Sequence, residues 1–233
     1  KNLGLACARN TAVNNATGDF VIHVDSDDYI DRDTITRCIV KQEENDSDIV
    51  SFGCYREYKS KTIVQIPPSF RNSKEMCLSI IEKKYHGKII NVGIWGRLIK
   101  RKLYVDYGIQ TEPGINMAED YQVITRLSYY AKRITTINNP LYHYNLQNTN
   151  SYVNTISPNL AYQSERSMQI VVDFFINKED EYREAVYSGL SHYLIRMTID
   201  GIMGDFGKEF YKNNLSKWNS LPNKIRNNNP LLR

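Results

Sequence analysis

The chain has 233 residues, of which 41% are hydrophobic and 24% charged, and its net charge is +4, an ordinary composition for a globular protein. This modest charge gives no sign of a nucleic-acid partner, and none is expected. The four cysteines are scattered without metal-ligand spacing, so we expect neither a zinc site nor a disulfide framework. The 17 tyrosines suit sugar-binding clefts, but they equally suit ordinary surface packing.

The first part of the chain alternates helical and extended patterns. Helices are predicted over 5–16, 34–43 and 74–84, and strands over 20–24, 48–55 and 61–66. The first strand is a continuous apolar run between a Gly-Asp turn and a group of acids, which is typical of a buried strand. Its His23 is expected to be a core histidine, and Asp31 or Asp33 to cap the next helix. The alternation predicts an α/β fold.

The second part becomes helical. A helix is predicted over 119–131, two short strands over 134–137 and 141–144, and further helices over 159–176 and 179–203. The polar stretch 148–157 ends in proline and separates these last helices from the rest. We therefore expect a core over 1–152 and a helical extension over 153–233.

Three aspartates, Asp25, Asp27 and Asp28, follow the first predicted strand. A strand that ends in Asp-x-Asp places carboxylates at the carboxyl edge of the sheet, where open α/β folds bind ligands. Because these groups repel one another, we expect a hard divalent cation, Mg²⁺ or Mn²⁺, between them. Such a cation takes one or two carboxylate oxygens and completes its shell with substrate phosphate. The pattern indicates a metal that binds a diphosphate.

The residues that follow these acids argue against two different kinds of acidic site. An EF-hand loop starting at Asp25 would need glycine and glutamate where Ile30 and Thr36 stand, which excludes it. The motif of a haloacid-dehalogenase-like phosphatase resembles Asp-x-Asp-x-Thr/Val. Here Tyr29 stands at the Thr/Val position, which counts against such a phosphatase. A charged loop that caps the following helix remains the alternative without a metal.

Several blocks along the chain together resemble glycosyltransferase family 2. The family motifs are Asn-x-Gly-x-x-x-Ala-Arg-Asn, Ala-x-Gly-Asp/Glu, a strand with Asp-x-Asp-Asp, Trp-Asn-Lys-Leu, Gly-Glu-Asp and a tyrosine-rich strand. The matching segments are, in the same order, 2–10, 16–20, 24–30, 95–101, 118–120 and 140–144. The resemblance implies a GT-A fold, a Rossmann-like mixed α/β sheet, with a C-terminal helical extension. The sheet is expected to be N-terminally incomplete, because the family's first nucleotide-binding strands would precede this chain.

The resemblance also implies roles on the nucleotide side. Asp27 is expected to bind the metal, with Asp25 as a second ligand nearer the nucleotide ribose and Asp28 in a supporting, cofactor-binding role. Arg9 matches a position that contacts the nucleotide; a helix arginine paired with an acid is the alternative. His143, on the tyrosine-rich strand, is an additional candidate ligand of the metal or diphosphate.

On the acceptor side, Asp120 is the expected general base, with Glu119 beside it as second choice or as an acceptor-orienting group. Two acids at a helix start also favour the helix dipole, which would give them a purely structural role. Trp95 is expected either to stack on an acceptor sugar or to pack in the core. Two positions depart from the family pattern: Gly96 replaces the usual asparagine, and Asn145 stands where arginine often follows the tyrosines.

The function implied is an inverting, metal-dependent hexosyltransferase-type enzyme. It would move a sugar from a nucleotide-sugar, a UDP-sugar by preference, to a glycan or lipid-linked acceptor in bacterial surface polysaccharide synthesis. The alternative is a non-catalytic fragment of the same fold that serves as a binding or scaffold piece. No run approaches the roughly 18 apolar residues of a membrane span, and a cytoplasmic location is expected. The segment 208–233, with six Lys or Arg against Glu209, would either contact the inner membrane face or remain a solvated helix end.

Overall fold

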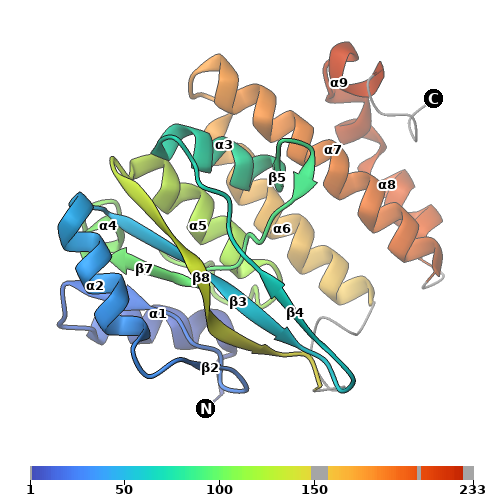
Figure 1. Cartoon of the computed structure of the whole chain (residues 1–233). Coiled ribbons are helices and arrows are strands. Elements are labelled where there is room, and N and C mark those ends of the chain that lie inside the picture. Colours follow the sequence, from blue (N-terminus) through green and yellow to red (C-terminus); the bar gives the residue numbers. More distant parts are fainter. Residues whose placement is uncertain (1, 148–156, 204–205, 228–233) are drawn as a thin grey trace.

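A mixed β-sheet with helices on both faces forms the centre of the molecule (Figure 1). The computed structural model describes residues 2–147, 157–203 and 206–227. The strands are β1 (Phe20–Ile22), β2 (Tyr29–Ile30), β3 (Ile49–Glu57), β4 (Thr62–Gln65), β7 (Arg97–Lys100) and β8 (Ile134–Asn145), with a separate hairpin of β5 (Lys84–Tyr85) and β6 (Lys88–Ile89). Their order in the sheet is β1-β7-β3-β8-β2, and β4 pairs with the second half of β3. The β3–β8 pair is parallel, whereas the other pairs of this sheet are antiparallel.

The helices divide between the two faces of the sheet. They are α1 (Leu5–Asn15), α2 (Thr34–Asn45), α3 (Ser73–Glu82), α4 (Arg101–Asp106), α5 (Glu119–Tyr130), α6 (Pro158–Phe175), α7 (Asp180–Met203), α8 (Gly207–Ser220) and α9 (Asn223–Asn227). Figure 1 shows α3, α5 and α6 behind the sheet, with α7, α8 and α9 farther to the side. Helix α2 packs on β3 and β8.

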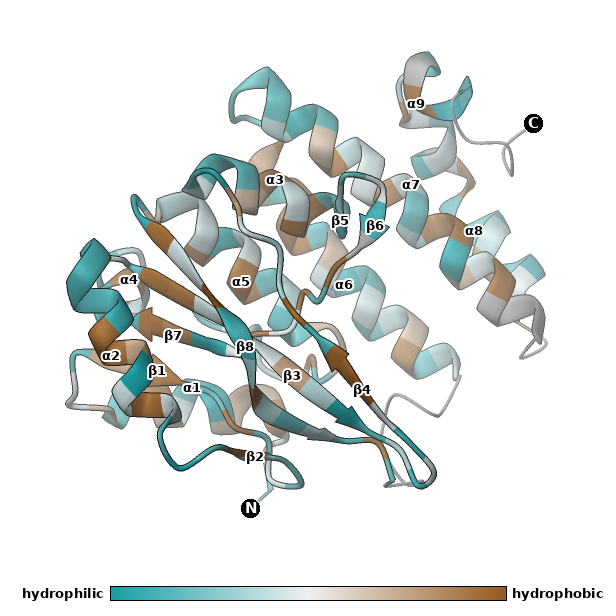
Figure 2. Cartoon of the chain, in the orientation of Figure 1, coloured by the Kyte–Doolittle hydropathy of each residue, from teal (hydrophilic) through white to brown (hydrophobic). Residues whose placement is uncertain are grey.

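Alternating side chains on the central strands supply both hydrophobic cores. Ile49 and Ile99 belong to the larger cluster, which extends into the helices behind the sheet. Their neighbours Val50 and Leu98 point to the other face and pack with Cys38 of α2. All five are at most 3% exposed, and full burial of an aliphatic side chain contributes about 1.5–3 kcal/mol. Figure 2 shows hydrophobic stretches in β1 and β7. The central strand β3 is buried from Ile49 to Cys54, as a strand covered on both faces should be.

The α/β architecture expected from the sequence is confirmed, and most predicted elements occur with small shifts at their ends. One prediction is wrong: the two short strands over 134–137 and 141–144 are a single strand, β8. Its register against β3 shifts on either side of Gly53, which pairs with Pro140. Asp33 is the N-cap residue of α2, but its side chain makes no capping hydrogen bond. The sequence patterns did not predict β2, the β5–β6 hairpin or α4.

The expected division between 152 and 153 falls outside the described residues. The helices that follow it share a core with the helices behind the sheet, since Met168 and Phe175 of α6 cluster with Ile124 and Leu127 of α5. In the described ranges, no helix combines the length and the hydropathy that crossing a membrane requires.

Candidate functional site

One arginine joins two acidic segments that lie far apart in the sequence. The Nη2 atom of Arg9, on α1, donates to Asp25 Oδ1 at 2.8 Å. Its Nη1 atom donates to Glu119 Oε1 at 2.5 Å and also to Asp120, both at the start of α5. The side chains of Arg9 and Glu119 are only 10% and 8% exposed. We call these four residues the Arg9 cluster; it brings together the expected nucleotide-side and acceptor-side residues.

Helix α1 is held against the segment before α5 by side-chain hydrogen bonds. Asn116 Oδ1 accepts from the amide of Ala6 at 3.0 Å, and a Cβ on Gly4 would come within 2.6 Å of that oxygen. Gly4 also has φ +86°, a conformation that L side chains rarely adopt. Asn10 donates to the carbonyl of Thr111 at 2.8 Å and accepts from its amide at 2.9 Å. These contacts account for the glycine and the last asparagine of the first motif, because they align α1 with the segment before α5.

Burial is the main influence on the pKa of Glu119. It raises the pKa of this carboxyl, against the nearby charge and hydrogen bond of Arg9, and the negative charge of Asp25 adds to the rise. Asp120 is the more accessible of the α5 pair, with its side chain 19% exposed. A general base has to reach an acceptor hydroxyl, so the accessible Asp120 suits that role better than Glu119.

Asp28 is fixed by the neighbouring strand β8. Tyr142 donates its hydroxyl hydrogen to Asp28 Oδ2 at 2.7 Å, and the same hydroxyl accepts from the amide of Asp25 at 3.1 Å. The amide of Asn145 donates to Asp28 Oδ1 at 2.9 Å. Burial raises the pKa of Asp28 despite these hydrogen bonds, and the charges of Asp25 and Asp27 raise it further. Asp28 therefore shapes the loop 25–28, which we call the acidic loop. Its anchor is Tyr142, which lies in the tyrosine-rich segment 140–144 but had no predicted role.

The acidic loop suits a cation that needs few protein ligands. Among residues 2–147, 157–203 and 206–227, no group of three or more His, Cys, Asp or Glu side chains is arranged to hold a metal ion. Asp27 is exposed in the turn after β1, and Asp25 is half-buried beside it. Mg²⁺ is bound through one or two carboxylates and completes its shell with water and phosphate. Asp27 and Asp25 fit that donor set.

His143 lies in a different environment from the one expected. Its Nδ1 is 2.7 Å from Glu57 Oε1 and its Nε2 is 3.0 Å from Asp31 Oδ1. The ring stacks between Tyr29 and Tyr55, with centroid distances of 4.1 and 4.7 Å. Both ring nitrogens thus have carboxylate partners. The structure does not bring His143 into the Arg9 cluster, and we leave it out of the proposed metal site.

Trp95 connects the acidic loop with the second hydrophobic core. Its ring stacks on Tyr142 at 4.8 Å with an interplanar angle of 23°, and it also lies 5.2 Å from the ring of Tyr144. It is half-buried and packs on the core cluster that contains Phe52. Through Tyr142 it lies one aromatic ring away from Asp28. Trp95 therefore both contacts the core and lines a pocket.

Comparison with known proteins relates this geometry to an enzyme family. Residues 1–107 match the sequence model of Glycosyl transferase family 2. The chain is 28% identical to the uncharacterized glycosyltransferase EpsJ of Bacillus subtilis over 155 residues, which are 64% of this chain and 44% of that protein. It is 27% identical to glycosyltransferase GlyA of Streptococcus pneumoniae over 154 residues, 63% of this chain and 22% of that protein. It is 24% identical to a cholesterol galactosyltransferase of Borreliella burgdorferi over 193 residues, 79% of this chain and 52% of that protein.

The fold has solved counterparts. S. aureus TarS residues 1–349 in complex with UDP-GlcNAc superposes with a TM-score of 0.70 and 18% identity, covering 97% of this chain and 64% of that one. The complex of the same TarS segment with UDP gives a TM-score of 0.63 with 20% identity, covering 85% of this chain and 54% of that one. The chain spans 22% to 52% of the length of EpsJ, GlyA and the galactosyltransferase. The sequence match over residues 1–107 makes this part of the chain similar to glycosyl transferase family 2, and the superposition on TarS shows that its architecture is the GT-A fold.

Proposed function

We propose that this protein transfers a sugar, with inversion, from a nucleotide-sugar to a glycan or lipid-linked acceptor in surface polysaccharide synthesis. The observation that carries the proposal is the Arg9 cluster, in which Asp25 of the acidic loop and Asp120 of α5 contact the same guanidinium. A transferase needs a donor-binding group and an acceptor-activating group within a few ångströms of one reacting carbon. A uridine nucleotide is the preferred donor because the related TarS structures hold UDP and UDP-GlcNAc.

In the proposed reaction, the acceptor hydroxyl oxygen forms a bond to the anomeric carbon while the bond from that carbon to the diphosphate oxygen breaks. The carboxylate of Asp120 takes the hydroxyl proton. Glu119 orients the acceptor or the base, and Arg9 provides positive charge near the nucleotide. Asp27 and Asp25 would hold Mn²⁺ or Mg²⁺, which, when bound, offsets negative charge on the leaving diphosphate.

Contact with a membrane surface belongs to the same proposal. On α8, Phe210 and Trp218 are buried at 8% and 6% exposure, whereas Tyr211 and Leu215 are 43% and 41% exposed. Lys212 is exposed on the same helix. Apolar and basic side chains that share an exposed helix surface favour anionic lipid. Co-sedimentation with vesicles of anionic and of neutral lipid tests this contact. We expect the protein to bind the anionic vesicles and not the neutral ones.

The first test of the donor site is calorimetric titration with UDP in the presence and absence of Mn²⁺. We expect metal-dependent binding that Asp27→Asn abolishes and that Asp33→Asn leaves unchanged. Asp33 is a matched control because it is an exposed aspartate a short distance along the same segment. Binding of UDP that is indifferent to both metal and Asp27→Asn would refute the metal assignment.

The second test concerns turnover. Asp120→Asn should retain UDP binding and lose transfer and donor hydrolysis, since it removes the proposed base and leaves the acidic loop intact. A folded wild-type chain that binds no UDP under either condition would contradict the transferase proposal for this chain. That result would favour a non-catalytic binding or scaffold role.

A further inference from the structure

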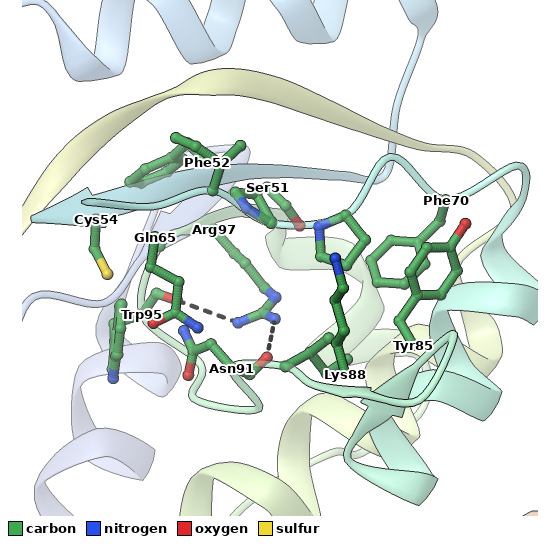
Figure 3. Close-up of a pocket in the computed structure, with 15 residues that line it drawn as sticks. Ser51, Phe52, Cys54, Gln65, Phe70, Tyr85, Lys88, Asn91, Trp95 and Arg97 are labelled. Atoms are coloured by element: carbon green, nitrogen blue, oxygen red, sulfur yellow. Dashed lines mark hydrogen bonds between the residues drawn. The ribbon is translucent and has the colours of Figure 1, made fainter. Parts of the chain in front are cut away.

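A pocket of about 350 Å³ is lined by Trp95, whose ring also stacks on Tyr142. It is formed by β3, β4, the segment 66–70 that follows β4, and the segment that runs from β5 to β7. Figure 3 shows its main side chains: Gln65, Phe70, Tyr85, Lys88, Trp95 and Arg97. The rings of Phe70 and Tyr85 meet edge to face at 5.1 Å and form its aromatic end. The wall thus combines aromatic rings, amides and two cations.

Arg97 is a buried cation that has no carboxylate partner among the described residues. It is 5% exposed, and its guanidinium donates to backbone carbonyls alone: those of Trp95 and Asn91, each at 3.2 Å, and that of Gly93. No ion pair joins it to an acid in the part of the chain that the structure describes, and its Nε is buried with no hydrogen-bond partner. Buried charges in proteins are generally paired, because desolvation without a counter-charge is costly.

The charge of Arg97 persists near neutral pH. Burial lowers its pKa to about 10, and the group remains protonated well above pH 7. Lys88 supplies a second cation: it is exposed on β6, and Figure 3 shows its side chain extending toward the centre of the pocket. Two positive side chains therefore face a cavity without a negative one on its wall among the described lining residues.

We propose that this pocket binds a saccharide that carries an acidic group, a phosphate or a carboxylate. The acidic group lies against Arg97 and Lys88, because a planar guanidinium suits both kinds of oxyanion. The sugar ring lies against Trp95 or Tyr85, whose rings offer apolar faces, and Gln65 and Asn91 bond to its hydroxyls. The assignment of this saccharide as the acceptor rests on the proposed function, whereas its binding to the pocket is independent of that function.

The experiment is a set of calorimetric titrations of the full chain with glucose 6-phosphate, glucuronate and neutral glucose. We expect binding of at least one acidic sugar, with glucose binding undetectable, and the preferred acid distinguishes a phosphate from a carboxylate ligand. Lys88→Ala should weaken that binding about tenfold through the loss of one charge-assisted contact. Lys102→Ala, at an exposed lysine on α4, is the matched control and should change nothing.

Arg97→Gln should abolish binding, and Lys88→Ala carries the test if the buried substitution prevents folding. The proposal is overturned if the folded wild type binds none of the acidic sugars, if glucose binds equally well, or if Lys88→Ala and Lys102→Ala behave alike. Titration of the same samples with UDP and Mn²⁺ reports on the donor site separately. Acidic-sugar binding without UDP binding would refute the transferase proposal and leave the pocket assignment standing.

Discussion

Replacing Arg9 by methionine removes the one cation of the Arg9 cluster while keeping a side chain of similar length. Three carboxylates would then face one another without the guanidinium that now contacts all of them. In such a partly buried site, like charges repel strongly and hydration recovers little of the lost interaction. We expect Arg9→Met to destabilise the fold markedly at neutral pH.

The size of the expected stability loss follows from how deeply the three carboxylate partners of Arg9 are buried. Removing one member of a buried ion pair costs about 3–5 kcal/mol. The carboxylate side chains here range from 8% exposed for Glu119 to 31% for Asp25, so solvent screens part of the effect. We therefore expect a loss of about 3 kcal/mol, the lower end of that range. A domain stable by about 5–15 kcal/mol would remain folded, and the loss would be measurable.

The dependence of the loss on pH provides a sharper test. Burial already raises the pKa of Glu119, and loss of Arg9 would raise it further. When the pKa of a carboxyl is higher in the folded than in the unfolded protein, its charge lowers the stability of the fold. This loss of stability is complete above the folded-state pKa and disappears below the unfolded-state pKa of about 4.3. The loss in Arg9→Met should therefore shrink as the pH falls from neutral toward about 4.3.

Urea unfolding at several pH values, followed by circular dichroism, measures both effects. The matched control is Arg166→Met, because Arg166 bonds to Glu112 at 2.7 Å with both side chains more exposed, at 39% and 36%. That exposed pair should contribute about 0–1 kcal/mol. If Arg9→Met costs no more than Arg166→Met, or if its cost is the same at every pH, the Arg9 cluster is not a buried charge network.

Three further predictions concern the surroundings of the site. Gly53→Ala should cost about 1–3 kcal/mol in urea unfolding, because the new Cβ would lie 2.7 Å from the carbonyl oxygen of Gln65; a neutral result would mean that β4 moves freely. Tyr142→Phe should cost about 1–3 kcal/mol, since it leaves a carboxylate oxygen of Asp28 without its donor, and an unchanged midpoint would contradict that. Burial lowers the pKa of His143, but the hydrogen bonds that it donates to its two carboxylate partners outweigh this and raise the pKa. Its contribution is therefore present below about pH 6.5 and lost as pH rises through the folded value, so His143→Gln should differ from the wild type more at about pH 6 than at about pH 9.

The sequence predicts the elements of this fold better than their arrangement. Apolar runs and helical spacing are local signals, and they located α1, α2, β3 and α5 within a few residues. The continuity of β8 could not be read from them, because Pro140 ordinarily interrupts a strand. Proline is tolerated at sheet irregularities, and here the register of β8 against β3 shifts where Pro140 pairs with Gly53.

The site shows the same limit at the level of side chains. Acidic motifs singled out Asp25 and Asp120, but their meeting on Arg9 depends on how α1 packs against α5. On β8, neighbouring residues point to opposite faces of the sheet. Tyr142 therefore reaches the acidic loop, and His143 turns away to Glu57. Choosing between these two residues as partners of the loop required the register of β8 against β2.

The charge balance of the site bears directly on how it could accept a nucleotide diphosphate. Five carboxyl groups, those of Asp25, Asp27, Asp28, Glu119 and Asp120, are gathered around or beside one arginine. His23 does not offset them, because burial, with the nearby charge of Arg9, lowers its pKa to about 4 and leaves it neutral at pH 7. A diphosphate would enter against this excess of negative charge unless cationic charge accompanied it or carboxyls took up protons. The raised pKa values of Asp28 and Glu119 make the second route available, whereas the exposed Asp27 favours the first. Titration of UDP distinguishes the two routes. Entry with a cation makes UDP binding depend on Mn²⁺, whereas entry with protons makes UDP binding stronger as the pH falls.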